Sequence, residues 1–317
     1  MKRIKIVVVV VLLGLGLGLS GGAQQARTVF EIDPGVALLG AAAAGLSIAE
    51  GAETLYYNPA NLSELPGISF SSFYASYLGL ANYSALALTF RNWGVAALLL
   101  SSTGIQGYDD EGGTTDALAY RNTGFLFGAG VDPSDLPFLP DFAIDMSLGA
   151  RIKILTARVG EATGNGFSFD LGFRTVFPDM HFGGFSVSDF TLGVAAVNLF
   201  GGVSYDTASD DFLMDIQIGT SARFAEMFRL AFDVHLAGSL HVGVIFEPMP
   251  TFAFRVGLIS RDGVSVTAGL GVNVEGFLLD YAYVTHTLGG THRISLTLDF
   301  SSLDISALSR SLRRLLP

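Results

Sequence analysis

The sequence predicts an all-β protein: a transmembrane antiparallel β-barrel of about fourteen strands with an N-terminal plug or hatch. Half of the 317 residues are hydrophobic and only 15% are charged, whereas a soluble chain of this size needs more charge to cover its surface. After residue 22, however, no apolar run reaches the ~20 residues that a membrane-spanning helix requires. A hydrophobic chain without such a helix is typical of membrane barrels, in which lipid-facing and lumen-facing residues alternate.

The first 23 residues are typical of a signal peptide. Lys2, Arg3 and Lys5 form a basic start, residues 6–19 are apolar, and small residues follow, which predicts cleavage after Ala23. A retained membrane anchor is the alternative, but no charged stop-transfer pattern follows the apolar run. The absence of cysteine excludes a lipoprotein anchor, disulfides and thiolate metal sites.

The charge balance disfavours nucleic acid as a partner. Removing Lys2, Arg3 and Lys5 from the 18 basic residues leaves 15 against 29 acidic ones in the mature chain. Nucleic-acid binding depends on neutralising phosphates with basic side chains, so we expect none here.

The period of two residues is visible strand by strand. In residues 143–154 one face carries Ile144, Met146, Leu148, Ala150, Ile152 and Ile154, and the other Asp145, Ser147, Gly149, Arg151 and Lys153. Residues 213–224, 228–236 and 264–272 repeat the pattern. A soluble sandwich would alternate in the same way, but these segments reach the ~9–11 residues that cross a bilayer at a tilt, and soluble strands are usually shorter.

Counting such segments gives about fourteen, and single-chain barrels prefer even numbers. They cover residues 68–78, 82–91, 93–102, 121–131, 143–157, 165–177, 187–199, 212–224, 227–236, 239–247, 251–260, 263–273, 275–285 and 291–300. An even count returns the C-terminus to the side from which the plug is expected to enter. Long connections at 103–120 and 200–211 are expected outside the cell and short turns inside, with 132–142 and 178–186 as exceptions.

The domains predicted from this pattern are a signal peptide (1–23), a plug or hatch (24–67), the barrel (68–300) and a periplasmic tail (301–317). The last strand ends on Phe300, which resembles the terminal strand that the barrel-insertion machinery recognises, so this machinery is an expected partner during biogenesis. The tail is either a short amphipathic helix at the inner leaflet or a frayed polar end.

The predicted plug is centred on residues 54–62, which follow a run of small residues at 39–45. Pro59 fixes its own φ and disfavours helix at Asn58, and the Asn58 amide can bond to nearby backbone. Together these residues predict a turn held against the inner wall of the barrel. A structural turn without any ligand role is the plainer interpretation. The plug residues proposed on this basis are Leu55, Tyr56, Tyr57, Asn58, Pro59, Ala60 and Leu62.

Residues 51–62, Gly-Ala-Glu-Thr-Leu-Tyr-Tyr-Asn-Pro-Ala-Asn-Leu, resemble a signature near the N-terminus of FadL-type long-chain fatty-acid transporters. They look closer still to the related PorV/PorQ family, which also ends on a strand like residues 288–296. Asn61 stands where the signature usually has Gly. The resemblance implies a fourteen-stranded barrel with a hatch folded inside it. In the transporter branch hydrophobic ligands pass through it, and in the PorV branch the barrel is an accessory of a secretion system.

Charges of both signs fall on the faces predicted to line the lumen. The plainer interpretation is an internal salt-bridge network, and the functional one is that some charges hold the hatch or line a polar path. These residues are Asp145, Arg151, Lys153, Asp170, Arg174, Asp215, Arg223, Arg229, Asp233, Arg255, Asp280 and Arg293.

Neither metal chemistry nor catalysis is predicted. The five histidines lack zinc-binding spacing, although His235 and His241 lie on adjacent strands and can face each other. The acidic run at 109–113 does not match a calcium loop, and no Gly-x-Ser-x-Gly elbow occurs. We therefore expect no enzyme, no cofactor and no metal.

Three functions remain open from the sequence. The first is outer-membrane transport of hydrophobic, fatty-acid-like small molecules through the hatch-occluded barrel, with outer-membrane lipids and a hydrophobic ligand as partners. The second is a PorV/PorQ-like accessory that binds proteins of a secretion system. The third is a structural or adhesive outer-membrane barrel.

Overall fold

The computed structural model describes residues 28–77, 79–107, 112–114, 117–137, 144–182, 185–206, 208–261, 263–286 and 289–301. The predicted signal peptide, the acidic run at 109–111 and the predicted tail beyond Ser301 lie outside the described residues.

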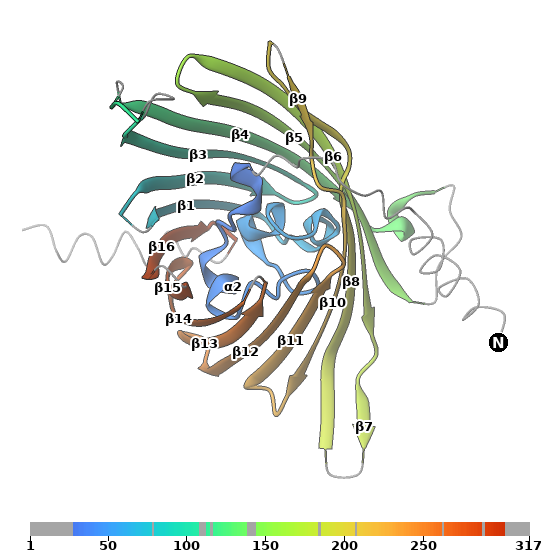
Figure 1. Ribbon diagram of the computed structural model, residues 1–317. Helices are drawn as coiled ribbons and strands as arrows, with labels where there is room; N and C mark the ends of the chain where they lie inside the picture. The colour runs from blue at the N-terminus through green and yellow to red at the C-terminus, as the bar shows by residue number, and fades with distance from the viewer. Residues whose placement is uncertain are drawn as a thin grey trace, which may run out of the picture.

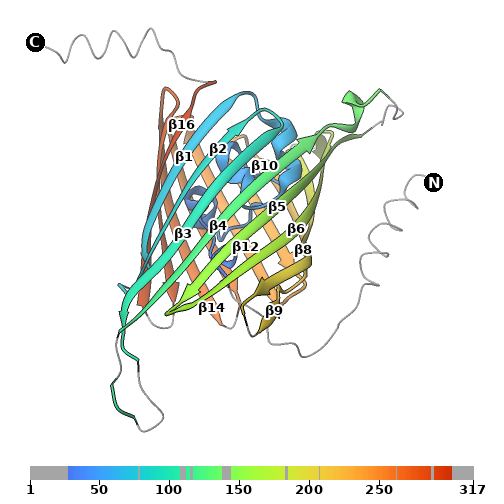
Figure 2. The same cartoon turned by 90° about the horizontal axis from the view of Figure 1, so that it is seen from above.

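The chain forms a closed antiparallel barrel of fourteen strands (Figures 1 and 2). Each strand pairs with its neighbours in the sequence, and the pairing of β1 with β16 closes the ring. The strands of the ring are β1 (Ile68–Tyr77), β2 (Ala81–Phe90), β3 (Trp93–Ile105), β4 (Leu118–Val131), β5 (Asp145–Val159), β6 (Ala162–Phe177), β8 (Phe185–Ser204), β10 (Asp215–Phe224), β11 (Phe228–His235), β12 (Ser239–Met249), β13 (Phe252–Ser260), β14 (Val264–Val274), β15 (Phe277–His286) and β16 (Gly289–Asp299). The predicted strand number is confirmed.

Two further strands are too short to have been predicted. β7 (Met180–Phe182) and β9 (Ser209–Asp211) each pair with one end of β8, which is 20 residues long. They extend β8 beyond the ring at both ends of the barrel, and Figure 1 shows the β7 hairpin protruding.

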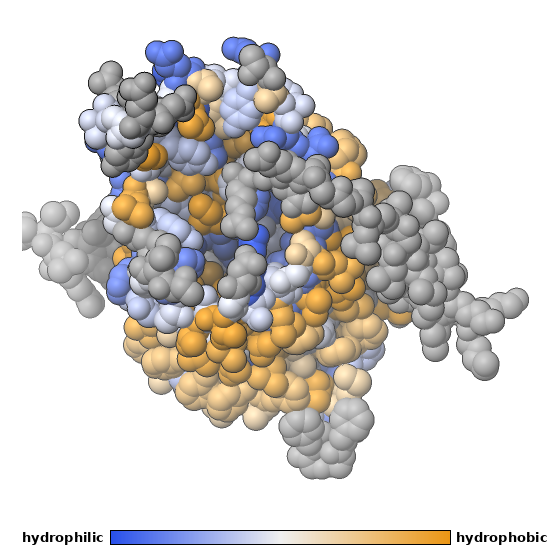
Figure 3. All heavy atoms as spheres, viewed as in Figure 1, coloured by the Kyte–Doolittle hydropathy of each residue, from blue (hydrophilic) through white to orange (hydrophobic). Residues whose placement is uncertain are grey.

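The predicted alternation holds along the strands. In β5 the side chains of Ser147, Arg151 and Lys153 are buried in the lumen, whereas Ile152 and Ile154 are exposed on the outside. Figure 3 shows a continuous hydrophobic surface on the outer wall over β11–β13. An apolar outer band over a mixed interior is the arrangement expected of a barrel in a bilayer. None of the described helices is long and apolar enough to cross a membrane.

The connections at the two ends of the barrel differ as predicted, including the two predicted exceptions. We call the end where β1 begins and β16 ends the terminal end, and the other the distal end. The distal end has the long connections after β3 and β8, but the terminal end has the stretch 132–144 and the β7 hairpin. These two connections are the ones expected as exceptions to the short turns at this end.

Residues 28–67 lie inside the barrel, and we call them the inner segment (Figures 1 and 2). They contain short 3-10 helices η1 (Val29–Glu31), η2 (Gly51–Leu55) and η3 (Pro59–Glu64) and the five-residue helix α2 (Val36–Gly40). A fourth, η4 (Pro133–Asp135), belongs to the stretch between β4 and β5.

The inner segment runs through the lumen from one end to the other. Near its start, Glu31 lies 3.7 Å from Arg261 in the distal turn between β13 and β14. At its end, Gly67 lies beside Ser301 at the terminal end. The first described residues therefore lie toward the distal end, not at the terminal side from which the plug was expected to enter.

Candidate functional site

The inner segment touches the wall at strand positions occupied by glycine. A Cβ at Gly149 would lie 2.2 Å from the carbonyl carbon of Pro59, and one at Gly130 would lie 2.7 Å from the backbone nitrogen of Ser63. Only glycine leaves room for another backbone this close. We call these two residues, with Gly128 and Gly172, the glycine patch. The four glycines come from β4, β5 and β6, and η3 packs against them.

Asn58 fixes η3 to this patch. Its Nδ2 donates to the carbonyl oxygens of Leu46 and Phe173, both at 3.0 Å, and its Oδ1 accepts from the backbone nitrogen of Ala60 at 3.1 Å. Asn58 thus caps η3, and Pro59 occupies the first position of the helix. The side chain is fully buried. One amide therefore joins two parts of the inner segment to strand β6.

The other predicted plug residues pack around this turn. Leu55 and Leu62 are fully buried and lie over Gly128. Ala60 is buried against Gly149 and Gly172, and Tyr56 is half-buried against the apolar cluster. These side chains are apolar, so they fill the space between the inner segment and the wall.

Tyr57 holds the inner segment in its fold. Its hydroxyl donates to Asp33 Oδ2 at 2.6 Å and lies 3.3 Å from the Gly35 carbonyl oxygen. Its ring lies where a Cβ on Gly35 or Gly45 would stand, at 2.7 and 2.9 Å. The residue thus joins the start of the inner segment to its middle.

Arginines of the wall bond to backbone carbonyls of the inner segment. An irregular segment cannot satisfy its own backbone groups as a helix or sheet does, and a buried unpaired carbonyl is costly. The guanidinium groups supply these missing donors, which the sequence alone does not reveal. The donors and their acceptors are Arg151 with Leu55, Arg174 with Ser47 at 3.1 Å, and Arg293 with Asp33.

Wall residues on β11, β12 and β14 bind further backbone groups of the inner segment. Thr267 Oγ1 accepts from the nitrogen of Ala42 at 3.0 Å, and Asp233 Oδ2 accepts from that of Leu46 at 3.0 Å. His241 Nδ1 donates to the carbonyl oxygen of Ala42 at 2.7 Å. Thr267 and His241 were not predicted as site residues. In the sequence each appears only as a polar residue at an inward strand position. Alternation alone does not distinguish such a residue from the other polar residues that line the lumen.

Three deeply buried charges form a triad on β5 and β6. Asp170 Oδ2 lies 2.6 Å from Arg151 Nη2, and Asp170 Oδ1 lies 2.9 Å from Lys153 Nζ; the Asp170 side chain has no exposed surface. Asp170 also accepts from the backbone nitrogen of Asn198 at 2.7 Å, where β8 bulges. Because Arg151 also reaches Leu55, the triad links the wall to the inner segment.

The remaining predicted lumen charges lie in separate groups, not in one network. Several pair with acids that were not predicted to face the lumen. Glu50 and Glu64 lie in the inner segment. Asp189 lies in a bulge with φ of 50°, where the alternation of inward and outward residues is broken. Asp145 is exposed at the start of β5 and forms no ion pair with a described residue. Three are pairs: Arg255 with Asp280 at 2.7 Å, Arg174 with Glu64 at 3.5 Å, and Asp215 with His235 at 3.8 Å. The fourth group is larger: Asp189 lies 3.1 Å from Arg223 and 3.7 Å from Arg229, Glu247 lies 3.5 Å from Arg223, and Glu50 lies 3.5 Å from Arg229.

His235 and His241 face each other as predicted, with ring centroids 4.4 Å apart. Among the described residues, no group of three or more His, Cys, Asp or Glu is arranged to hold a metal ion. Since His241 bonds to the inner segment, the pair belongs to the contacts that hold that segment.

A cavity of about 530 Å³ lies between the inner segment and the wall near the terminal end. It is lined by both signs of charge, including Arg174, Arg229, Glu64 and Asp280. Glu53 lies at its edge, where its carboxylate oxygens accept from the backbone nitrogens of Ala37 at 2.9 Å and Leu38 at 3.2 Å. The cavity is therefore the polar part of the lumen, whereas the buried apolar residues Tyr83, Leu98 and Leu155 lie farther toward the distal end.

We expect α2 to detach from Glu53 more readily at pH 9 than at pH 6. Burial raises the pKa of the Glu53 carboxyl from 4.5 to about 8, and the nearby Asp280 carboxylate acts in the same direction. Stability from a raised pKa is complete below the unfolded value and is lost as the pH rises through the folded value. Hydrogen exchange at residues 36–40, corrected for intrinsic rates, measures this. Glu53→Gln should abolish the pH dependence, and an unchanged dependence in this variant would contradict the assignment.

No protein family model and no curated protein matches the sequence. Among solved structures, the barrel is similar to the Ralstonia pickettii toluene transporter TbuX, with a TM-score of 0.53 and 12% identity over 83% of this chain and 96% of TbuX. The Pseudomonas putida toluene transporter TodX aligns with a TM-score of 0.49 and 10% identity over 87% of this chain and 97% of TodX. The likeness to TbuX agrees with the barrel fold that the resemblance at residues 51–62 implied, but it shows neither a FadL-type nor a PorV/PorQ family. At such identities the comparison establishes the fold alone: the chain shares its barrel architecture with TbuX.

Proposed function

We propose that the protein is an outer-membrane channel for hydrophobic small molecules and that the inner segment is the hatch that closes it. The observation that carries the proposal is the path of residues 28–67, which run through the lumen from the distal to the terminal end. The fold shared with TbuX, a toluene transporter by name, supports a hydrophobic cargo. A transporter as structural neighbour is also consistent with the absence of a catalytic role.

The distal half of the lumen is the proposed capture region. On β3 and β5 its inward side chains include the buried Leu98, Leu100 and Leu155, which belong to the same apolar cluster as Val29 at the start of the inner segment. This region is packed, so cargo displaces the first turn of the inner segment in order to enter. We place the distal end outside the cell and the terminal end in the periplasm.

Fatty acids belong to the proposed cargo class together with aromatic hydrocarbons. The cavity at the terminal end offers the guanidinium groups of Arg174 and Arg229, and arginine pairs well with a carboxylate. A carboxylate-bearing cargo would meet these cations after the hatch moves. Uptake of labelled oleate and labelled toluene by the same cells separates the two classes.

Asn58→Ala should speed the uptake of labelled toluene about fivefold. The substitution removes the side chain that caps η3, which destabilises the closed position of the hatch by ~1 kcal/mol. A loss of this size raises the population with an open hatch about fivefold. Uptake is measured in a Gram-negative host that lacks its own hydrophobic-compound channels. Asn165→Ala, on the outward face of β6, is the control. Equal uptake by wild type, control and Asn58→Ala would show that the inner segment does not act as a hatch.

A secretion accessory is the second candidate. The observation that favours it is the protrusion of the β7 hairpin beyond the ring at the terminal end (Figure 1), where a periplasmic partner could bind. Binding of the C-terminal domain of a secreted protein to the purified barrel, and its loss when residues 179–186 are replaced by a short turn, would favour this function over transport.

A further inference from the structure

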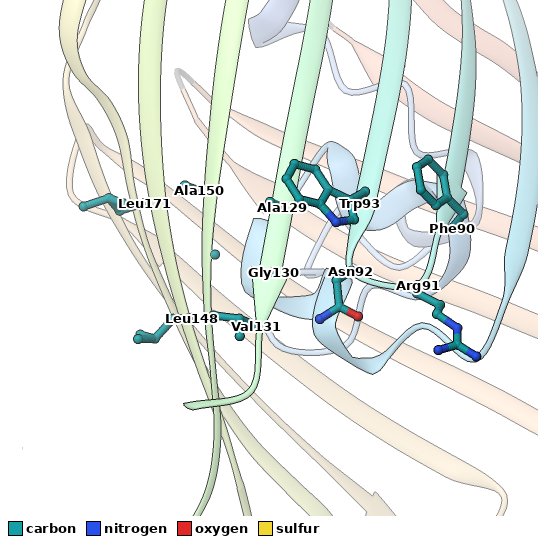
Figure 4. Close-up of a pocket in the computed structure, with 11 residues that line it drawn as sticks. Phe90, Arg91, Asn92, Trp93, Ala129, Gly130, Val131, Leu148, Ala150 and Leu171 are labelled. Carbon is teal, nitrogen blue, oxygen red and sulfur yellow. The ribbon is translucent and has the colours of Figure 1, made fainter. Parts of the chain in front are cut away.

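A groove of about 730 Å³ lies on the outside of the barrel wall at the terminal end. Its floor consists of Ala129 and Gly130 on β4 and Gly149 and Ala150 on β5, and Figure 4 shows Trp93 among the side chains that border it. This volume falls within the 300–1,000 Å³ that is usual for small-molecule sites.

The groove exists because small residues meet across two strands. Ala129 pairs directly with Ala150, and Gly130 with Gly149. The flanking side chains are large and project outward, with Trp93 59% and Leu171 45% exposed. These large side chains extend farther from the sheet than the small residues of the floor, and the difference leaves an apolar depression.

The groove is closed toward the lumen. The ladder from β3 through β4 to β5 is unbroken here, with Trp93 opposite Ala129 and Ala129 opposite Ala150. On the inner side of the same sheet lies η3, packed against Gly130 and Gly149. An occupant of the groove therefore comes from the membrane, not from the channel.

One end of the groove is cationic. Arg91 and Asn92 form the turn between β2 and β3, and the turn is anchored because Arg91 N donates to Gly67 O at 3.1 Å and Asn92 O accepts from Gly130 N at 2.9 Å. The Arg91 side chain is exposed and forms no ion pair with any described residue. Trp93 follows at once, and tryptophan prefers the boundary between lipid tails and head groups.

We infer that this groove binds one anionic phospholipid of the leaflet at the terminal end. An acyl chain lies over Ala129 and Ala150 beside Trp93, and the phosphate lies against Arg91, whose guanidinium suits phosphate geometry. The cation at the groove end selects a lipid over an uncharged cargo. The site does not depend on transport, so failure of the proposed channel function leaves it standing.

Lipid binding at the groove can be measured by tryptophan fluorescence, because Trp93 is the only tryptophan in the chain. Phosphatidylglycerol with brominated acyl chains quenches tryptophan fluorescence on contact, and competition with unbrominated lipids in mixed micelles gives relative affinities. We expect phosphatidylglycerol to bind about fivefold more tightly than phosphatidylcholine, the effect of one interfacial cation. Arg91→Gln should bring this ratio to about one, while Arg158→Gln, at the distal end of β5, should leave it unchanged.

Filling the groove tests the apolar part of the site. Ala150→Leu should reduce quenching by brominated phosphatidylglycerol severalfold, whereas Ala268→Leu, an exposed outward position on β14, should behave as wild type. Both are lipid-facing, so neither should prevent folding. The inference is overturned if wild type shows no preference between the two lipids, if Ala150→Leu and Ala268→Leu are quenched alike, or if toluene relieves the quenching and phosphatidylglycerol does not.

Discussion

Replacing Gly149 by alanine should dislodge η3 while the barrel still assembles, and uptake of labelled toluene should rise roughly tenfold or more. The added Cβ would stand 2.2 Å from Pro59 C and 2.3 Å from Ala60 N. Both are backbone atoms, so no side-chain rotation relieves the overlap, and overpacking of this kind costs about 1–3 kcal/mol. Because the strain lies between hatch and wall, moving the hatch relieves it. Uptake in cells and protease cleavage within residues 28–67 measure the effect.

Gly124→Ala is the matched control for this prediction. Gly124 also faces the inner segment from the neighbouring strand β4, but its added Cβ would meet only side-chain atoms of Phe30 and Val29. The closest of these atoms is at the tip of the Phe30 ring, and neither residue belongs to η3, so η3 should stay in place. If the two variants take up toluene equally fast, backbone contact at the glycine patch does not hold the hatch.

Asp170→Ala should destabilise the folded barrel by about 3–5 kcal/mol, the usual cost of removing one partner from a buried ion pair. The substitution leaves Arg151 and Lys153 buried without a counter-charge, and it leaves the backbone nitrogen of Asn198 without its acceptor. The measurement is the temperature at which the folded form, which migrates faster in unheated gels, is lost.

Two variants make the Asp170 experiment specific. Glu161→Ala removes an exposed carboxylate from the turn between β5 and β6 and should leave the transition temperature unchanged. Asp170→Asn keeps an acceptor for Asn198 but loses the charge, so it should fall between wild type and Asp170→Ala. A transition in Asp170→Ala at the temperature of the Glu161→Ala control would show that the triad contributes nothing to stability.

The strands of the ring were predictable because the pattern that marks each strand lies within a few consecutive residues. A strand between lipid and lumen alternates with a period of two, so residues 143–157 already indicate β5 (Asp145–Val159) and its inward Arg151 and Lys153. β7 and β9 have three residues each, too few for a period to appear. In β8 the period breaks at the bulge around Asn198, where residues of β8 lack a partner on β6.

The site was predictable only in part. The sequence indicated a turn at Asn58 and Pro59, because both residues act on their own backbone. It did not indicate that Phe173 and the glycine patch receive this turn, since that depends on how the closed barrel brings β4, β5 and β6 around the segment. The available signal was glycine at inward positions of adjacent strands, such as Gly130 and Gly149, which implies a second backbone close by.

The wall recognises the inner segment mostly through its backbone: Arg174 at the Ser47 carbonyl, Asp233 at the Leu46 N–H group and Thr267 at the Ala42 N–H group. Such contacts make few demands on the side chains of the segment. Its sequence can therefore drift over evolutionary time while its path through the barrel persists, provided that Asn58 and the facing glycines remain. Asn58 with its facing glycines is therefore a better search pattern for distant relatives than overall sequence similarity, which is only 12% for TbuX despite the shared fold.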